Sequence, residues 1–405
     1  MLTRREWLSM TAVGLFARGR REQSGITPRE LRIRRMIDEY EKQGFHRTAT
    51  EVDRRSADWL AGEVRDAGLD PSLESFPIRR VDPVDVSVVV DGKKIAGVPL
   101  FDGAFTNAAG IQGKLGAIDG AAPIGLTDTA PNAAAAGPLG DARLANRHRA
   151  IVCVTRGARP GLCPSNADSF LKPFGPPVVQ VSSEERERLE RAARQGLEVH
   201  VIASVRRTAA QAFNVTASMT GTSRTALPLV IMTPRSGWWT CASERGGGIA
   251  CWIEMMREFR VAPPPRDVLF VASSGHELGH LGINAFIDRR EGIVDRTALW
   301  FHFGANIGAA QQPGNTIQAS DDGFESRLET AMTTAGLTVD RRTPRGRVPG
   351  GEAEAVHRGG GRYVSVIGGN ALFHNQADRG PGTVDVGAVS RFIDAFTMLA
   401  RSFTA

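Results

Sequence analysis

Residues 267–282, with the sequence DVLFVASSGHELGHLG, contain the most informative pattern in this chain of 405 residues. Residues 268–272 are an uninterrupted apolar run, which is typical of a strand buried on both faces of a sheet. Three groups able to bind a metal ion or transfer a proton follow, namely His276, Glu277 and His280. Polar side chains at the carboxyl end of a buried strand lie where open α/β sheets place their ligand sites. The stretch therefore predicts an α/β fold with a site at this strand end.

Two other interpretations of the same stretch stay open at this point. His276-Glu277-x-x-His280 matches the helical zinc motif, in which two histidines one turn apart hold the metal and the glutamate acts as base. That motif requires a helix, whereas here it directly follows a strand and contains Gly279. The other interpretation is a polar strand end without any chemistry.

Length and composition indicate a globular protein with more than one folded unit. Hydrophobic residues make up 41% and charged residues 23% of the chain, which are ordinary values. At this length two domains, or one domain with a large insertion, are expected. The formal net charge is +6, and half of it lies in the first 25 residues, where five arginines accompany two glutamates. No basic stripe interleaved with aromatic residues follows, so nucleic acid is not an expected partner.

The four cysteines show no CxxC spacing. A disulfide between Cys153 and Cys163 is compatible with an exported protein, but buried free thiols are the expected state.

The N-terminus carries a pattern of its own. Arg4 and Arg5, in TRREWL, are followed by a short apolar run that ends near Ala17, and residues 1–25 thus resemble a twin-arginine export signal. The run is too short to span a bilayer, so no membrane span is expected. We expect export in the folded state to the periplasm or beyond.

The order of elements predicts two units. Residues 26–83 and 213–405 alternate strands and helices, which indicates one α/β domain with a mostly parallel central sheet flanked by helices. Residues 84–212 differ, because short strands recur between Gly- and Ala-rich segments, and residues 182–195 are their one strong helix. We expect this block to be an inserted β-rich domain, with the low-complexity stretch 133–140 as a loop.

Five short motifs then occur in the order typical of a known family. They are Thr233-Pro-Arg-Ser236, Glu244-Arg-Gly-Gly-Gly248-Ile-Ala250, His276-Glu277-Leu-Gly-His-Leu-Gly282, Ala305-Asn-Ile-Gly308 and Phe373-His374-Asn-Gln-Ala-Asp378. From about residue 26 to 403 the sequence resembles the zinc aminopeptidase family that includes glutamate carboxypeptidase, the transferrin receptor ectodomain and glutaminyl cyclase. Residues 175–185, GPPVVQVSSEE, are similar to the protease-associated domain inserted in that family. The resemblance implies the zinc aminopeptidase-like α/β fold, with residues 84–212 as that insertion.

The resemblance also implies a reduced metal site. Thr233 and Ala305 stand where the family has the two private ligands of one zinc ion, so this ion should be absent. The second zinc ion keeps Glu277 and His374, and Glu244 stands at the position of the bridging aspartate. These three ligands would leave a fourth coordination position open, as is typical of a catalytic zinc.

The general base of the family is also changed, because His276 replaces the first glutamate of its glutamate pair. An imidazole can take a proton from zinc-bound water, whose pKa the metal lowers to about 7. Alternatively, His276 is itself a ligand, supported by His280 or His302. A shift of the loop by one residue would place Ser243 rather than Glu244 at the bridging position and leave two ligands.

Two arginines favour a different role for the cleft. Arg235 and Arg245 bring positive charge to the expected site, which weakens the affinity for a divalent cation. A guanidinium in a cleft also suits a carboxylate or another anion. Trp238 beside them is either an apolar wall of the ligand site or a core residue.

The sequence therefore predicts an exported, peptidase-family hydrolase-like protein with at most one zinc ion, and not a conventional two-zinc aminopeptidase. It would act on a peptide or amide substrate with metal-bound water, His276 being the base. The alternative is a catalytically inactive homologue that binds an anionic ligand or a protein partner in the same cleft. The residues expected to contact substrate or ligand are Arg235, Arg245, Trp238, His280 and His302. A salt bridge from either arginine to Glu244 or Glu277 would favour the alternative.

Overall fold

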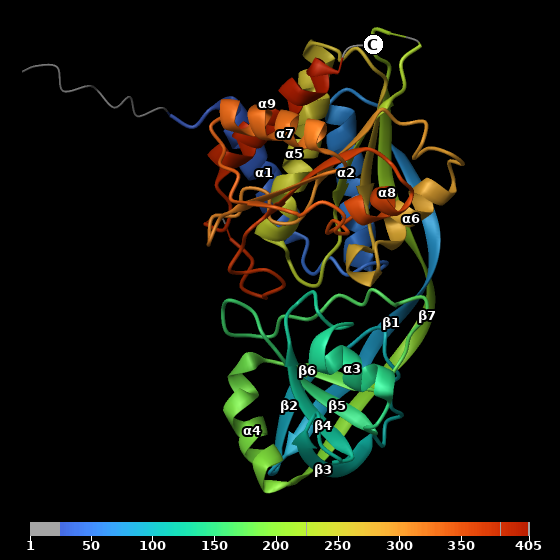
Figure 1. Ribbon diagram of the computed structural model, residues 1–405, viewed down its shortest axis with the longest axis vertical. Coiled ribbons are helices and arrows are strands. Elements are labelled where there is room, and N and C mark those ends of the chain that lie inside the picture. The colour runs from blue at the N-terminus through green and yellow to red at the C-terminus, as the bar shows by residue number, and fades with distance from the viewer. Residues whose placement is uncertain (1–24, 224, 381, 404–405) are drawn as a thin grey trace, which may run out of the picture.

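Two long antiparallel strands, β1 (Ser72–Val90) and β7 (Glu198–Met219), run through both lobes of the molecule and join them (Figure 1). The structure is a computed structural model that describes residues 25–223, 225–380 and 382–403. The two strands pair from Ser72 opposite Thr216 to Val90 opposite Val199. One irregularity interrupts the pairing beside Pro83, which has no N–H to donate to the ladder.

The larger lobe contains the predicted mostly parallel sheet, and this prediction is confirmed. Its four central strands are parallel neighbours, in the order β9 (Val268–Ser273), β8 (Leu229–Pro234), β10 (Leu299–Phe303) and β13 (Tyr363–Gly368). Antiparallel pairing with β7 continues the sheet beyond β9, and antiparallel pairing with β11 (Asn315–Ala319) continues it beyond β13. The short β12 (Arg341–Arg342) ends it, parallel to β11.

Helices cover both faces of this sheet (Figure 1). One face packs into the main core with α1 (Pro28–Lys42), α2 (Glu51–Asp66), α5 (Ala242–Val261), α7 (Asp322–Thr334) and α9 (Val386–Ser402). The other face packs against α6 (Leu281–Asp288) and α8 (Ala353–Arg358). Strand residues alternate between the two cores, since Ile231 belongs to the first and Met232 to the second. Side-chain caps start several helices, including Thr27 at α1 and Asp385 at α9.

The smaller lobe is built around a second run of strands. Their order is β2 (Lys93–Pro99), β6 (Val178–Val181), β5 (Ala150–Thr155), β4 (Ile124–Thr129) and β3 (Ile111–Ala117), with β3 next to β7. Two helices, α3 (Gly137–Ala145) and α4 (Arg186–Gln195), accompany them, and a 3-10 turn, η1 (Ser183–Glu185), precedes α4. The assignment of residues 84–212 as a separate protease-associated domain stays a prediction.

Some local predictions hold and others do not. The four cysteines are buried free thiols, as expected. The expectation of a loop over residues 133–140 is wrong in part, because α3 begins at Gly137. Residues 1–24, with the arginine pair of the expected export signal, lie outside the described residues. Within the described part of the chain, no helix is both long and apolar enough to cross a membrane.

Candidate functional site

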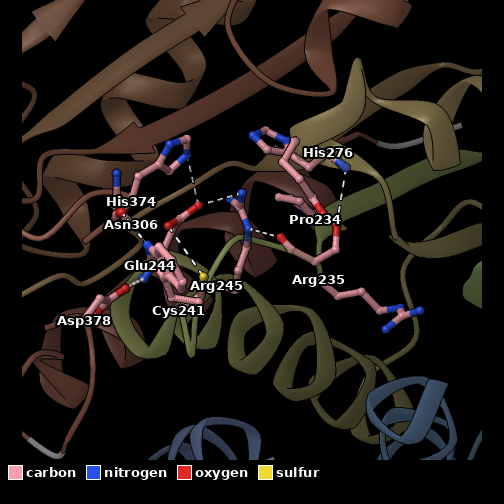
Figure 2. Close-up of polar contacts among 12 residues, drawn as sticks. Pro234, Arg235, Cys241, Glu244, Arg245, His276, Asn306, His374 and Asp378 are labelled. Atoms are coloured by element: carbon pink, nitrogen blue, oxygen red, sulfur yellow. Dashed lines mark hydrogen bonds and ion pairs between the residues drawn. The ribbon is translucent and has the colours of Figure 1, made fainter. Parts of the chain in front are cut away.

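The residues singled out from the sequence gather at the carboxyl end of the parallel strands (Figure 2). Glu244 and Arg245 lie in the first turn of α5, and His276 and Glu277 lie in the 3-10 turn η2 (His276–Leu278) after β9. His374 follows β13, in the left-handed backbone region. All five residues are buried, and His276 is the most exposed of them at 6%.

An ion pair occupies the centre of this group. Arg245 Nη2 lies 2.8 Å from Glu244 Oε1, with the two side chains 0% and 1% exposed. Arg245 Nε donates a hydrogen bond of 2.6 Å to the Ser236 carbonyl, which fixes the guanidinium in place. Burial alone would raise the pKa of Glu244, but nearby positive charge, that of Arg245 first, outweighs it and holds that pKa below its ordinary value. Glu244 is therefore an ionised carboxylate whose charge Arg245 balances.

His374 completes this arrangement from the other side. Its Nε2 lies 3.5 Å from Glu244 Oε1, and its Nδ1 lies 2.6 Å from the Pro164 carbonyl, in the segment between β5 and β6. A carbonyl can only accept, so Nδ1 carries the proton, and Nε2 of the neutral ring is an acceptor. Burial lowers the pKa of His374. Within the described residues, neither Glu244 Oε1 nor His374 Nε2 has a hydrogen-bond partner, so the contact with Arg245 is an ion pair without hydrogen-bond geometry.

Glu277 is committed to other partners. Its Oε1 accepts from the backbone N–H of Thr48 (3.0 Å) and from Thr48 Oγ1 (2.6 Å), and its Oε2 accepts from Ser236 Oγ (2.6 Å). Its backbone carbonyl accepts from Ala167 N (2.9 Å), in the smaller lobe. Glu277 thus joins three loops by hydrogen bonds. The structure brings Glu244 and His374 together, but it does not add the Glu277 carboxylate to them.

These residues do not fit a zinc ion as they are placed. The guanidinium of Arg245 already supplies the positive charge beside Glu244, and both oxygens of Glu277 are occupied by neutral donors. Across the described ranges, no group of three or more His, Cys, Asp or Glu side chains is placed to hold a metal ion.

His276 belongs to a second buried cluster. Its Nδ1 lies 2.9 Å from Glu352 Oε1, while His302 Nε2 lies 3.0 Å from Glu352 Oε2. Glu352 is 0% exposed. Burial would raise its pKa, but the two imidazoles hold that pKa well below its usual range. Sequence reasoning identified both histidines and missed Glu352, which lies in the Gly/Arg/Pro-rich segment 341–361. The only signal was the pair of glutamates, Glu352 and Glu354, in an otherwise basic stretch.

His280 does not share a helical face with His276. Gly279 and His280 are both in the left-handed region, and α6 begins only at Leu281. His280 Nδ1 lies 3.5 Å from Glu354 Oε2, and burial is the main cause that lowers the pKa of His280 to about 3. The regular helix that the helical zinc motif requires is therefore not formed.

Arg235 and Trp238 point into the core rather than toward Glu244. Arg235 Nη1 lies 2.9 Å from Asp53 Oδ1, and its Nη2 donates to the Phe213 carbonyl at 2.5 Å. Figure 2 shows its guanidinium directed away from the Glu244–Arg245 pair. Trp238 is 3% exposed, with its ring centroid 4.8 Å from that of Phe101. Both side chains hold neighbouring elements together.

The sheet order, the helices on both faces and the position of the site define the α/β fold of the zinc aminopeptidases. The predicted resemblance is confirmed at this level. The chain is similar to a solved zinc aminopeptidase from Bacillus subtilis, with a TM-score of 0.74 and 16% identity over 93% of this chain and 96% of that one.

Two further solved structures agree with this result. An aminopeptidase from Aneurinibacillus sp. strain AM-1 has a TM-score of 0.69 and 12% identity, over 91% of this chain and 92% of that one. A peptidase M28 precursor from Shewanella amazonensis SB2B has a TM-score of 0.67 and 14% identity, over 92% and 95%. At these identities the likeness establishes the fold and not the activity. No protein-family model matches the sequence, and no curated protein matches it.

Proposed function

We propose that this protein is a non-catalytic member of the zinc aminopeptidase fold, which binds a ligand or a protein partner in the cleft at the carboxyl end of its parallel strands. The observation that carries this proposal is the buried ion pair between Arg245 Nη2 and Glu244 Oε1, at 2.8 Å. It stands at the position where the family resemblance implies a metal ligand.

The charge of Arg245 opposes a divalent cation at Glu244. Two like unit charges 4 Å apart repel by about 4 kcal/mol at an effective dielectric constant of 20, and a zinc ion carries two charges. Turning the guanidinium away would leave a buried cation without its partner, which is also costly. Metal binding by the family ligands would therefore require a rearrangement of this pair.

Glu277 supports the same proposal. To join Glu244 and His374 around a metal, its carboxylate would have to give up the hydrogen bonds from Thr48 and Ser236. Each of those buried donors would then lack a partner, at about 1–3 kcal/mol apiece.

One observation favours a second candidate function, the single-zinc hydrolase with Glu244, Glu277 and His374 as ligands and His276 as base. Glu244 Oε1 and His374 Nε2 are two acceptors that lie 3.5 Å apart, an arrangement that a shared cation satisfies. In the structure, Arg245 provides that cation to Glu244.

Zinc content tests the two candidates. We would purify the protein without chelators, dialyse it against micromolar zinc, and measure zinc per chain beside the variant Glu277→Ala. The proposal predicts substoichiometric zinc in both proteins. Roughly one zinc per chain in the wild type, lost in the variant, would replace the proposal by the hydrolase.

A further inference from the structure

Glu352 accepts hydrogen bonds from two imidazoles at once. Its Oε1 lies 2.9 Å from His276 Nδ1 and its Oε2 lies 3.0 Å from His302 Nε2. Ser273 Oγ donates a further bond of 3.3 Å to Oε1. An ionised carboxylate can only accept, so the facing ring nitrogens must both carry protons.

The remaining hydrogen bonds of the cluster agree with this assignment. Gln318 Nε2 donates to Ser365 Oγ at 2.8 Å, so the single hydroxyl proton of Ser365 is free to point to His302 Nδ1, also at 2.8 Å. His302 Nδ1 is then an acceptor and His302 Nε2 the donor toward Glu352. Donors thus converge on the buried Glu352 carboxylate from two sides, from Gln318 through Ser365 and His302 on one side and from His276 on the other.

This arrangement determines the state of the outer edge of the His276 ring. With the proton on Nδ1, Nε2 carries a lone pair whenever the ring is neutral. Among the described residues, no hydrogen bond satisfies His276 Nε2, although the side chain is only 7% exposed. In the view of Figure 2 the rings of His276 and His374 both lie above the Glu244–Arg245 pair.

Neither of the two arginines expected at the site offers its guanidinium to an anion. The guanidinium of Arg245 is 0% exposed and paired with Glu244, and that of Arg235 is 0% exposed and paired with Asp53. Asp168 lies close enough to His276 for the two side chains to interact electrostatically, although burial raises the pKa of Asp168. A carboxylate or phosphate placed against the lone pair of His276 would therefore be repelled.

We propose that His276 Nε2 is the hydrogen-bond acceptor of the binding cleft, that Glu352 is the residue that positions it, and that the ligand presents an N–H or O–H donor, as an amide does, instead of an anionic group. This inference rests on the proposed function, because it assumes a cleft without metal.

The tautomer is directly measurable. We would record long-range 1H–15N spectra of protein labelled with 15N-histidine at mildly alkaline pH, with His276 assigned by the variant His276→Asn. The expected result is a protonated Nδ1 and an unprotonated Nε2. A proton on Nε2 at this pH, in either a neutral or a charged ring, would overturn the inference.

Two glutamates of the same segment provide the variant and its control. Glu352→Gln keeps the size but presents one donor and one acceptor, so it should convert His276 or His302 to a mixture of tautomers. Glu354→Gln, two residues away and near His280 instead, should leave the His276 spectrum unchanged. Equal spectra for all three proteins would remove Glu352 from its positioning role.

Two small probes with the same carbon skeleton test the ligand class. Butyramide has N–H donors, whereas butyrate has none and carries a negative charge. Butyramide should produce a saturable shift of the His276 Nε2 resonance, and butyrate at equal concentration should not. A shift with butyrate, or with neither probe, would overturn the ligand assignment. Zinc content, measured on the same sample, separates this failure from failure of the proposed function.

Discussion

The guanidinium of Arg245 reaches Glu244 Oε1, at 2.8 Å, although the two residues are neighbours in the first turn of α5. Adjacent helical residues point about 100° apart and do not normally meet. The contact depends on the Ser236 carbonyl, which holds Arg245 Nε. A cation at a helix N-terminus is also opposed by the helix dipole, so the attraction to Glu244 must outweigh that term.

Replacing Arg245 should create a latent metal site. In Arg245→Met, Glu244 becomes a buried carboxylate without its cation, and we expect a loss of about 3–5 kcal/mol of folding stability. Zinc should restore part of this loss by binding Glu244 and His374, whereas zinc should not stabilise the wild type. Thermal unfolding with and without zinc measures both effects. The double variant Arg245→Met with His374→Ala should lose the zinc response, and a response that persists would place the metal elsewhere.

We expect Arg235 to stabilise the fold rather than to bind a ligand. Its substitution by Met leaves Asp53 buried and unpaired, and should lower the free energy of unfolding by about 3–5 kcal/mol. Denaturant unfolding measures this value. The control is Arg55→Met on α2, because Arg55 and its partner Glu51 are 53% and 84% exposed. That change should cost less than about 0.5 kcal/mol. A small effect of Arg235→Met would reopen a ligand-binding role for this residue.

The glycines of α5 serve close packing. A Cβ atom at Gly247 would lie 1.8 Å from the Ile307 carbonyl oxygen, so Gly247→Ala must displace backbone. We expect Gly247→Ala to lower the free energy of unfolding by about 1–3 kcal/mol or more. At Gly62, in α2, a Cβ atom would meet nothing within 4 Å. Gly62→Ala should therefore raise the free energy of unfolding by about 0.5–1 kcal/mol. Urea midpoints compare the two, and similar midpoints would contradict the packing argument.

His46 should make stability depend on acidity. Burial lowers its pKa from 6.5 to about 3, so the folded state keeps the ring neutral where the unfolded chain takes up a proton. The stability that the folded protein gains from keeping His46 neutral is therefore fully present above pH 6.5. It is lost as the pH falls toward 3. The slope of unfolding free energy against pH should exceed that of His46→Gln by up to about 1.4 kcal/mol per pH unit. Parallel curves for the two proteins would contradict the shift.

Export by the twin-arginine route is a further proposal. Arg4→Lys together with Arg5→Lys keeps the charge but removes the arginine pair. We expect the double variant to stay in the cytoplasm, as followed by cell fractionation and immunoblotting. Unchanged export would exclude this route.

The fold could be predicted because its strongest signals are local. The apolar run of β9, followed at once by polar residues, fixes a buried parallel strand, and the helices around it carry their own caps. The unbroken length of β1 could not be predicted. Pro77 and Pro83 suggest breaks, and they are tolerated because the partner strand β7 holds this segment over its whole length.

The sequence predicts which residues lie at the site, but not which of their side chains contact one another. The sequence placed Arg245 near Glu244, yet whether the guanidinium fills that position depends on a rotamer held by the Ser236 carbonyl. Beyond the pair of glutamates in a basic stretch, the sequence does not indicate the role of Glu352, because that role arises only when α8 packs against β10 and β13. Such contacts between distant segments leave no periodicity in the sequence.

The ribbon of β1 and β7 also sets constraints on the order of folding. Val90 pairs with Val199 at the inner end of the ribbon, and Ser72 pairs with Thr216 at its outer end. The chain between Val90 and Val199 must therefore become compact before the strand ends at Ser72 and Thr216 can pair. The entropy of closing a chain loop grows with its length, which favours pairing that begins beside the smaller lobe and spreads outward. We expect pulse-labelled hydrogen exchange during refolding to protect Val88 before Leu73. The central sheet would then gain β7 beside β9 only after the enclosed segment has collapsed.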